Sequence, residues 1–163
     1  MTVTSYAIAL GSNRWSRWGS PEQTLRAAAD ALQVARLSRI LRTKAVGPAG
    51  RGFANAAALL QTDLLPPDLL AVLKQTERDF GRRGGRRWGP RVLDLDILLW
   101  SEGAWAGAGL AVPHPSFRSR AFVLAPLAEV APGWRDPLTG LTVRQLLHRL
   151  RAGRPVDPAR APS

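Results

Sequence analysis

Residues 91–100, which read RVLDLDILLW, decide the fold of this chain. Leu93, Leu95, Ile97 and Leu99 alternate with the remaining positions, and a period of two places all four side chains on one face of a β-strand. The alternation therefore predicts a strand with one buried face. Five further elements can be recognised upstream, and this strand is the last of the series.

The upstream elements are three strands and two helices. Short apolar runs bounded by turn residues predict strands at 6–10, 37–41 and 53–62. The first helix follows Ser20, which can cap it, with Pro21 at the first helical position and Gln23 completing a capping box. A second helix is predicted from the side chains that share one helical face, namely Leu69, Leu73, Thr76 and Phe80.

The order strand, helix, strand, strand, helix, strand is that of a ferredoxin-like α+β sandwich (βαββαβ), in which both helices pack on one face of an antiparallel sheet. The other face would be free for ligands. Beyond it we expect a C-terminal extension with an extended segment at 112–115 and short helices at 120–130 and after Thr142. We expect a single domain over residues 1–152 and a disordered Pro/Arg/Ala-rich tail over 153–163.

The composition is that of an ordinary globular protein. Of the 163 residues, 45% are hydrophobic and 21% are charged, which is typical of one compact domain. No run approaches the ~18 apolar residues that span a bilayer, and the N-terminus lacks a leader pattern, so we expect a cytoplasmic protein without a membrane partner. The absence of cysteine excludes disulfides, zinc–thiolate sites and thiol nucleophiles.

The formal net charge of +11 favours an anionic partner, either nucleic acid or a phosphorylated small molecule, because positive potential attracts such ligands. Nearly all of this charge is arginine, and an Ala/Arg/Gly-rich chain can also reflect biased codon usage. The local arrangement of the arginines has to distinguish an anionic partner from biased codon usage.

Asp94 and Asp96 lie two residues apart on the predicted strand, so both side chains leave the face opposite the leucines, with Cα atoms about 6.6–6.8 Å apart. Two carboxylates this close repel each other unless a cation lies between them. Oxygen ligands of this kind suit Mg²⁺, which substrate phosphates often complete. An isolated Asp-x-Asp is common, however, and both carboxylates could simply face solvent.

Arginines in the preceding loop favour the metal site. Residues 82–91 contain no carboxylate, and they contain Arg82, Arg83, Arg86, Arg87 and Arg91. Guanidinium groups bind phosphate oxygens bidentately and stabilise charge on a transferring group. Although Arg86 and Arg87 individually could be solvated, cations beside a metal site indicate a polyphosphate substrate. The sequence thus predicts magnesium-dependent phosphoryl transfer from ATP.

Residues 87–98 (RWGPRVLDLDIL) resemble the signature of the 6-hydroxymethyl-7,8-dihydropterin pyrophosphokinase family. Further matching segments follow in the family's order, namely Ala9-Leu10-Gly11-Ser12-Asn13, Arg42-Thr43, Val46-Gly47, Phe53-Ala54-Asn55 and Val112-Pro113-His114-Pro115. The resemblance runs from Tyr6 to about Pro132.

The resemblance implies transfer of the pyrophosphoryl group of ATP to the hydroxymethyl group of 6-hydroxymethyl-7,8-dihydropterin, with release of AMP, as a step of folate biosynthesis. By position, Asp94 and Asp96 would hold two Mg²⁺ ions, and Arg82 and Arg91 would contact the phosphates during in-line attack. Asp96 could also assist deprotonation of the hydroxyl. The expected partners are ATP and a reduced pterin, with no nucleic acid, and we expect a monomer.

The resemblance also assigns binding residues. The pterin would contact Thr43, Val46, Phe53, Asn55 and Phe122. ATP would contact Glu77, Arg82, Trp88, Arg91, Ile97, His114 and Arg120. From the residues alone, Phe53 and Phe122 could equally be core aromatics. Gly84 stands where the family usually has a second loop arginine, so Arg83 or Arg86 would have to substitute.

Loops 44–52 and 82–90 are rich in glycine, and we expect them to close over the substrates and exclude water. Two other functions stay open. A nucleotidyl-transfer enzyme of polymerase-palm type also carries paired aspartates on a ferredoxin-like sheet. An RNA-binding module fits the charge, but the chain lacks the aromatic-rich strand motif of that class.

Overall fold

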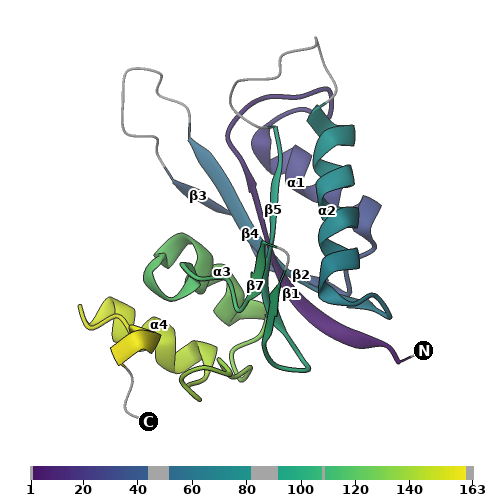
Figure 1. Cartoon of the computed structure of the whole chain (residues 1–163). Helices are drawn as coiled ribbons and strands as arrows, with labels where there is room; N and C mark the ends of the chain where they lie inside the picture. Colours follow the sequence, from purple (N-terminus) through teal and green to yellow (C-terminus); the bar gives the residue numbers. More distant parts are fainter. Residues whose placement is uncertain (1, 44–51, 82–91, 108, 161–163) are drawn as a thin grey trace.

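The computed structural model describes residues 2–43, 52–81, 92–107 and 109–160. Over these ranges the chain is a mixed α/β fold with four α-helices and an antiparallel sheet (Figure 1). Its first half contains β1 (Thr4–Ser12), α1 (Pro21–Leu32), β2 (Arg36–Leu37), β3 (Leu41–Thr43), β4 (Phe53–Thr62), α2 (Pro66–Gly81) and β5 (Asp94–Trp100). Its second half contains β6 (Trp105–Gly107), β7 (Leu110–Val112), η1 (Phe117–Ser119), α3 (Ala121–Val130), α4 (Val143–Arg151) and η2 (Pro158–Arg160).

β1 is a central strand of the main sheet. It pairs antiparallel with β4 on one side and with β5 on the other. The far edge of β4 pairs with both β2 and β3, so that the sheet order is β2-β4-β1-β5 with β3 beside β2 on the β4 edge. β6 and β7 form a separate hairpin.

The two faces of the sheet carry two different cores. α1 and α2 cover one face (Figure 1), where Leu25 and Leu73 are fully buried together with strand residues such as Ile8. α3 packs on the other face, and α4 packs against α3 and η1, so that Leu124 and Leu146 share one core with small strand residues such as Ala57. The second face, which we expected to be free for ligands, is therefore open only where α3 leaves it uncovered.

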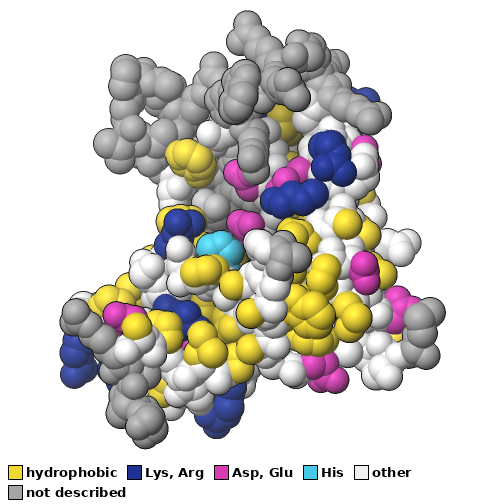
Figure 2. All heavy atoms as spheres, in the orientation of Figure 1, with side chains coloured by type: hydrophobic (Ala, Val, Ile, Leu, Met, Phe, Trp, Pro, Cys, Tyr) yellow, Lys and Arg dark blue, Asp and Glu magenta, His cyan; other side chains and the backbone are white. Residues whose placement is uncertain are grey.

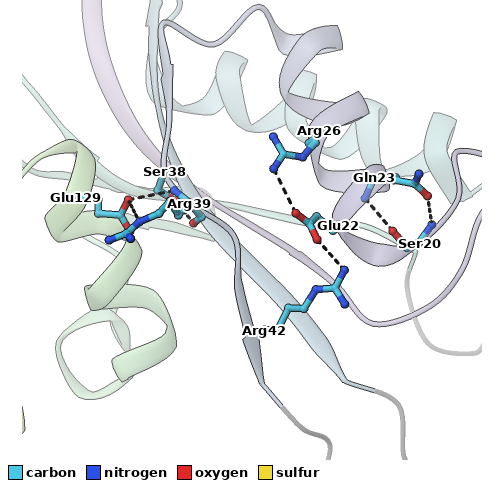
Figure 3. A network of polar contacts seen from close by, with 8 residues as sticks. All are labelled: Ser20, Glu22, Gln23, Arg26, Ser38, Arg39, Arg42 and Glu129. Atoms are coloured by element: carbon cyan, nitrogen blue, oxygen red, sulfur yellow. Dashed lines mark hydrogen bonds and ion pairs between the residues drawn. The ribbon is translucent and has the colours of Figure 1, made fainter.

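The predicted capping box at the start of α1 is confirmed. The Ser20 Oγ accepts a hydrogen bond from the Gln23 amide at 3.2 Å, and the Gln23 side chain accepts one from the Ser20 amide at 2.8 Å. Figure 3 shows that Glu22, in the same turn, binds both Arg26 and Arg42, so the helix is tied to β3. Hydrogen bonds from Arg42 and Arg26 lower the pKa of Glu22.

The strand predicted at 37–41 is two short strands, β2 and β3, and the residues between them include one more than the matching part of β4. Leu37 pairs with Ala58 and Leu41 with Asn55, so this strand advances one residue more than β4 does. Within the gap, the Ser38 Oγ accepts a hydrogen bond from a β4 amide at 2.9 Å. A hydroxyl thus replaces the backbone acceptor that a regular strand would supply.

Leu98 is an extra residue in β5, because Ile97 pairs with Ile8 whereas Leu99 pairs with the preceding residue, Ala7. An inserted residue reverses the alternation of side chains beyond it. Ile97 remains in the α1/α2 core and Leu99 joins the α3/α4 core. The prediction that Leu99 shares a face with Ile97 is therefore wrong.

The C-terminal helices begin where the sequence predicts. The Thr142 Oγ1 accepts a hydrogen bond from the Gln145 amide at 3.1 Å, and the Gln145 side chain accepts one from the Thr142 amide at 2.8 Å. In the predicted tail, Val156 packs against the α3/α4 core and η2 follows it. Among the described residues, no helix has the length and apolar character that crossing a bilayer would require.

Candidate active site

Four strand ends meet at one end of the sheet. Gly11, near the end of β1, pairs with Asn55 of β4 on one side and with Asp94 of β5 on the other. Thr43 ends β3 and pairs with Phe53, the first residue of β4. Directly opposed residues of an antiparallel pair share a face, so these side chains leave the sheet on the face that α3 covers only in part.

Small residues keep this corner hollow. Ala9 lies opposite Asp96, and Gly11 lies opposite Asp94. A Cβ atom on Gly11 would come within 3.3 Å of the Asn55 Oδ1, closer than side chains normally pack. Glycine therefore lets the Asn55 amide approach the end of β1.

A cavity of about 320 Å³ opens over the corner. The predicted residues that line it are Thr43, Phe53, Asn55, Asp94, Asp96, Arg120 and Phe122. Figure 2 shows acidic side chains gathered on this face beside histidine, basic and hydrophobic side chains. Residues from β3, β4, β5 and the start of α3, which are far apart in the chain, thus surround one space.

Asp94 and Asp96 are exposed, whereas Leu95 between them is buried. Within the described ranges, no cluster of three or more Asp, Glu, His or Cys residues could hold a metal ion. A pair of carboxylates suits Mg²⁺, because this ion keeps several waters and takes its remaining ligands from substrate phosphates. The donor set therefore fits a magnesium ion that arrives with a nucleotide.

Phe53 and Phe122 both line the cavity and are exposed, at 44% and 40% of their residue surface respectively. Rings buried in a core would not do so, and the alternative that these two are ordinary core aromatics is excluded. Two exposed aromatic rings beside the polar side chains of Thr43 and Asn55 can hold a flat heterocycle edged with donors and acceptors.

His114 lies near enough to Asp96 and to Arg120 to interact with the charge of each. The Ser116 amide donates to the His114 Nδ1 at 3.1 Å, so the proton of the neutral ring is on Nε2. Burial lowers the pKa of His114, while the charge of Asp96 acts to raise it and that of Arg120 to lower it further. At neutral pH the ring is therefore an uncharged donor at Nε2.

Arg120 precedes α3 and lines the cavity. Its guanidinium lies 5.9 Å from the centroid of the Phe122 ring. This places a cation beside an aromatic ring at the mouth of the site, where both an anion and a flat ring could be bound.

Two predicted nucleotide contacts point away from the cavity. Ile97 is 3% exposed and belongs to the α1/α2 core, because alternation places it opposite the aspartates. Glu77 of α2 accepts a hydrogen bond from the Leu95 amide at 2.7 Å and one from Lys74 at 3.3 Å. Both side chains therefore contact β5 or its neighbours on the α1/α2 side of the sheet, opposite the cavity.

The remaining predicted site residues lie outside the described residues. They are Val46 of loop 44–52 and Arg82, Trp88 and Arg91 of segment 82–91.

A second cavity, of about 520 Å³, adjoins the first through Asn13 and Phe53. Arg14, Trp15 and Arg42 also line it, and Trp15 is 72% exposed. None of these three residues is among those predicted from the sequence to bind a ligand. Their position in the sequence could have indicated a place near the site, because Arg14 and Trp15 directly follow the family-matching segment at the end of the first strand.

Comparison with known proteins identifies the family of this site. A model of the 7,8-dihydro-6-hydroxymethylpterin-pyrophosphokinase (HPPK) family matches residues 7–132. The chain is 42% identical over 137 residues to 2-amino-4-hydroxy-6-hydroxymethyldihydropteridine pyrophosphokinase of Pseudomonas aeruginosa, which covers 80% of this chain and 82% of that protein. It is 41% identical over 119 residues to the protein of the same name from Synechocystis sp., which covers 73% of this chain and 61% of that protein.

The fold is similar to that of the Plasmodium falciparum HPPK-DHPS protein in a crystal structure with pteroate, with a TM-score of 0.72 and 11% sequence identity. The similarity covers 93% of this chain and 44% of that chain. This chain therefore spans less than two thirds of the Synechocystis protein and less than half of the Plasmodium chain. By its matching residues and its fold, the chain belongs to the 7,8-dihydro-6-hydroxymethylpterin-pyrophosphokinase family.

Proposed function

We propose that this chain transfers the pyrophosphoryl group of ATP to the hydroxymethyl oxygen of 6-hydroxymethyl-7,8-dihydropterin, giving AMP and the pterin diphosphate in folate biosynthesis. The observation that carries the proposal is the shared cavity, in which Asp94 and Asp96 face the exposed rings of Phe53 and Phe122. A site for a metal-bound polyphosphate and a site for a flat ring thus lie within one space of about 320 Å³.

In the proposed complex the pterin ring lies between Phe53 and Phe122. The Asn55 amide and the Thr43 hydroxyl bind its polar edge, and Val46 adds an apolar contact. The exposure of both rings and the close approach of Asn55 to Gly11 support this placement.

Asp94 and Asp96 would hold two Mg²⁺ ions that bring in ATP and neutralise charge on its phosphates. The hydroxymethyl oxygen forms a bond to the β-phosphorus, the bond from that phosphorus to the oxygen bridging to the α-phosphate breaks, and AMP leaves with the bridging oxygen. Asp96 takes the proton of the hydroxyl.

We assign the polyphosphate contacts to Arg82 and Arg91, and the remaining nucleotide contacts to Trp88, Arg120 and the Nε2–H of His114. Arg120 lines the cavity and the His114 tautomer leaves a donor available, which supports these two assignments. Ile97 and Glu77 would act on the nucleotide through the position of β5.

The finer description of the fold is also part of the proposal. The sheet order β2-β4-β1-β5, with α1 and α2 on one face, supports a ferredoxin-like sandwich in which β2 and β3 together act as its second strand. We further propose a single catalytic domain over residues 1–152 and a monomeric cytoplasmic protein.

Product analysis tests the function. Incubation with Mg-ATP and 6-hydroxymethyl-7,8-dihydropterin should yield AMP and the pterin diphosphate in equal amounts, with neither formed when the pterin is left out. Release of inorganic pyrophosphate would instead indicate nucleotidyl transfer. Absence of AMP with all substrates present would overturn the proposal.

A further inference from the structure

Arg118 and Asp136 form a buried ion pair between η1 and the turn before α4. The Arg118 side chain is 3% exposed and that of Asp136 is 0% exposed. The guanidinium donates two parallel hydrogen bonds to the carboxylate, from Nε at 2.5 Å and from a terminal nitrogen at 2.7 Å. Such a bidentate pair fixes orientation as well as distance.

The Asp136 carboxylate is fully engaged. Besides both contacts from Arg118, it accepts hydrogen bonds from the Leu138 amide at 3.0 Å and from the Thr139 hydroxyl at 2.7 Å. The backbone of Asp136 is itself held by Leu141 and Gly140, each at 2.8 Å. The acceptor therefore belongs to a rigid turn directly before α4.

Arg118 belongs to the short helix η1, two residues before Arg120. The neighbouring Phe117 is 0% exposed and packs in the α3/α4 core with α4 residues such as Leu146. The Arg118 guanidinium lies 4.6 Å from the centroid of the Phe117 ring. One side of η1 is thus fixed to the C-terminal part of the chain.

The other side of this segment enters the active site. The His114 amide binds the Leu98 carbonyl of β5 at 3.0 Å, which fixes the beginning of the segment. Its end carries Arg120 and Phe122, both of which line the cavity. Between these two points, the ion pair and the burial of Phe117 both hold η1 in place.

Stability alone does not account for such a pair. Taking two charges out of water is costly, and an apolar pair of the same volume often stabilises a fold equally well. What the ion pair adds is a defined geometry, and that geometry is applied two residues from a predicted ligand contact.

We propose that Arg118 and Asp136 are positioning residues for the active site. Through them the segment after Pro132, which lies beyond the part of the chain that the family model matches, acts as a brace that holds Arg120 and Phe122 at the cavity. The inference rests on the proposed function, so product formation by the unchanged chain is established first, and its failure would concern the function and not the brace.

The test replaces the pair by apolar residues, in the double variant Arg118→Met/Asp136→Leu, which leaves no buried charge unpaired. Binding of the pterin is measured by fluorescence with Mg²⁺ and a non-hydrolysable ATP analogue, and folding by thermal denaturation. We expect a cooperatively folded protein whose dissociation constants for both ligands rise by about tenfold or more, since small displacements at a site are costly. Arg118→Lys, which keeps the charge but not the bidentate geometry, should lie in between.

A double-mutant cycle with Arg120→Ala separates positioning from general weakening. If the pair acts by placing Arg120, removal of the pair costs clearly less nucleotide-analogue affinity in the Arg120→Ala background than in the unchanged chain. Equal losses in both backgrounds would overturn the proposal.

The control is the exposed ion pair between Arg39 and Glu129, at 3.2 Å, which also joins α3 to a distant segment. Glu129→Gln should leave both dissociation constants unchanged. Unchanged ligand binding in the folded apolar double variant would contradict the brace. If that variant does not fold, unchanged binding in Arg118→Lys would contradict it equally.

Discussion

Glu77 accepts a hydrogen bond from the backbone amide of Leu95 at 2.7 Å, and Leu95 lies between the two aspartates of the site. Among the strands that the structure describes, β5 lies at the edge of the sheet, so no described strand binds this amide. The carboxylate of α2 takes the place of the missing strand, and it thereby sets the position of the residues on either side.

We expect Glu77→Met to weaken magnesium-dependent nucleotide binding and to leave the fold intact. The Leu95 amide would lose its acceptor, at a cost of about 1–3 kcal/mol for a buried donor. Glu77→Gln keeps an acceptor oxygen and should be milder. Amide hydrogen exchange at Leu95 measures the local effect and calorimetry measures nucleotide binding. Slow exchange at Leu95 in the Met variant would show that another acceptor serves this amide.

Asp94→Ala and Asp96→Ala should each abolish turnover while the protein stays folded. Removing one carboxylate relieves repulsion in the free protein and removes a metal ligand. Calorimetric titration of Mg²⁺ in the presence of a non-hydrolysable ATP analogue should show lost uptake in both variants. Turnover comparable to that of the unchanged chain, in either variant, would rule out the proposed metal site.

Phe53→Ala and Phe122→Ala should weaken pterin binding by about tenfold each, or ~1.4 kcal/mol, because each removes one ring face from a flat ligand. The melting temperature should change little, since both residues are exposed and neither belongs to a buried core. Val72→Ala removes a similarly exposed side chain, 42% exposed on α2, and serves as the control. Equal pterin affinity in all three variants would place the pterin elsewhere.

The Arg118–Asp136 pair should make stability depend on pH in the acid range. Burial acts to raise the pKa of Asp136, but hydrogen bonds from Arg118, Thr139 and Leu138 outweigh it and lower the pKa below its usual 3.8. A lowered pKa means that this stabilisation is fully present above the unfolded value and is lost as pH falls through the folded one.

Urea unfolding at several pH values checks this dependence. The free-energy difference between the unchanged chain and Asp136→Asn should be constant above about pH 5, at about 3–5 kcal/mol for a broken buried pair, and should shrink below pH 4. Glu129→Gln, at an exposed pair, should show no such change. A difference that stays constant down to pH 2 would mean that Asp136 does not titrate in this way.

Local features of the fold could be predicted from the sequence. Ser20 and Gln23, like Thr142 and Gln145, interact within a few residues, so their capping boxes can be recognised without tertiary information. The strand that begins at Phe53 could likewise be read from a continuous apolar run, and it is confirmed over its full predicted length.

Features that depend on register could not be predicted. The extra residues at Leu98 and between Leu37 and Leu41 become visible only when two strands are aligned, because each strand alone reads as regular. For the same reason the sequence predicted that Leu99 would share a face with Ile97, and the structure does not agree.

In the site, the family resemblance identified the aspartates and the aromatic residues that the cavity brings together. It also named Glu77, but as a nucleotide contact, and the contacts by which Glu77 and Arg118 support the site were not predicted. Glu77 meets Leu95 across 18 positions, and Arg118 meets Asp136 across 18 positions. No local pattern indicates such a contact. The partner of a long polar side chain is decided by tertiary packing, which the sequence alone does not reveal.

The additional residue at Leu98 has a consequence for length variation along β5. Before it, the strand presents carboxylates to the second face, and after it the strand presents a leucine to that same face. Deleting a single codon here would restore simple alternation, and either the carboxylates or the hydrophobic end of the strand would then turn to the wrong side. Variation in this strand should therefore be confined to substitutions, whereas insertions and deletions should collect in the connections on either side.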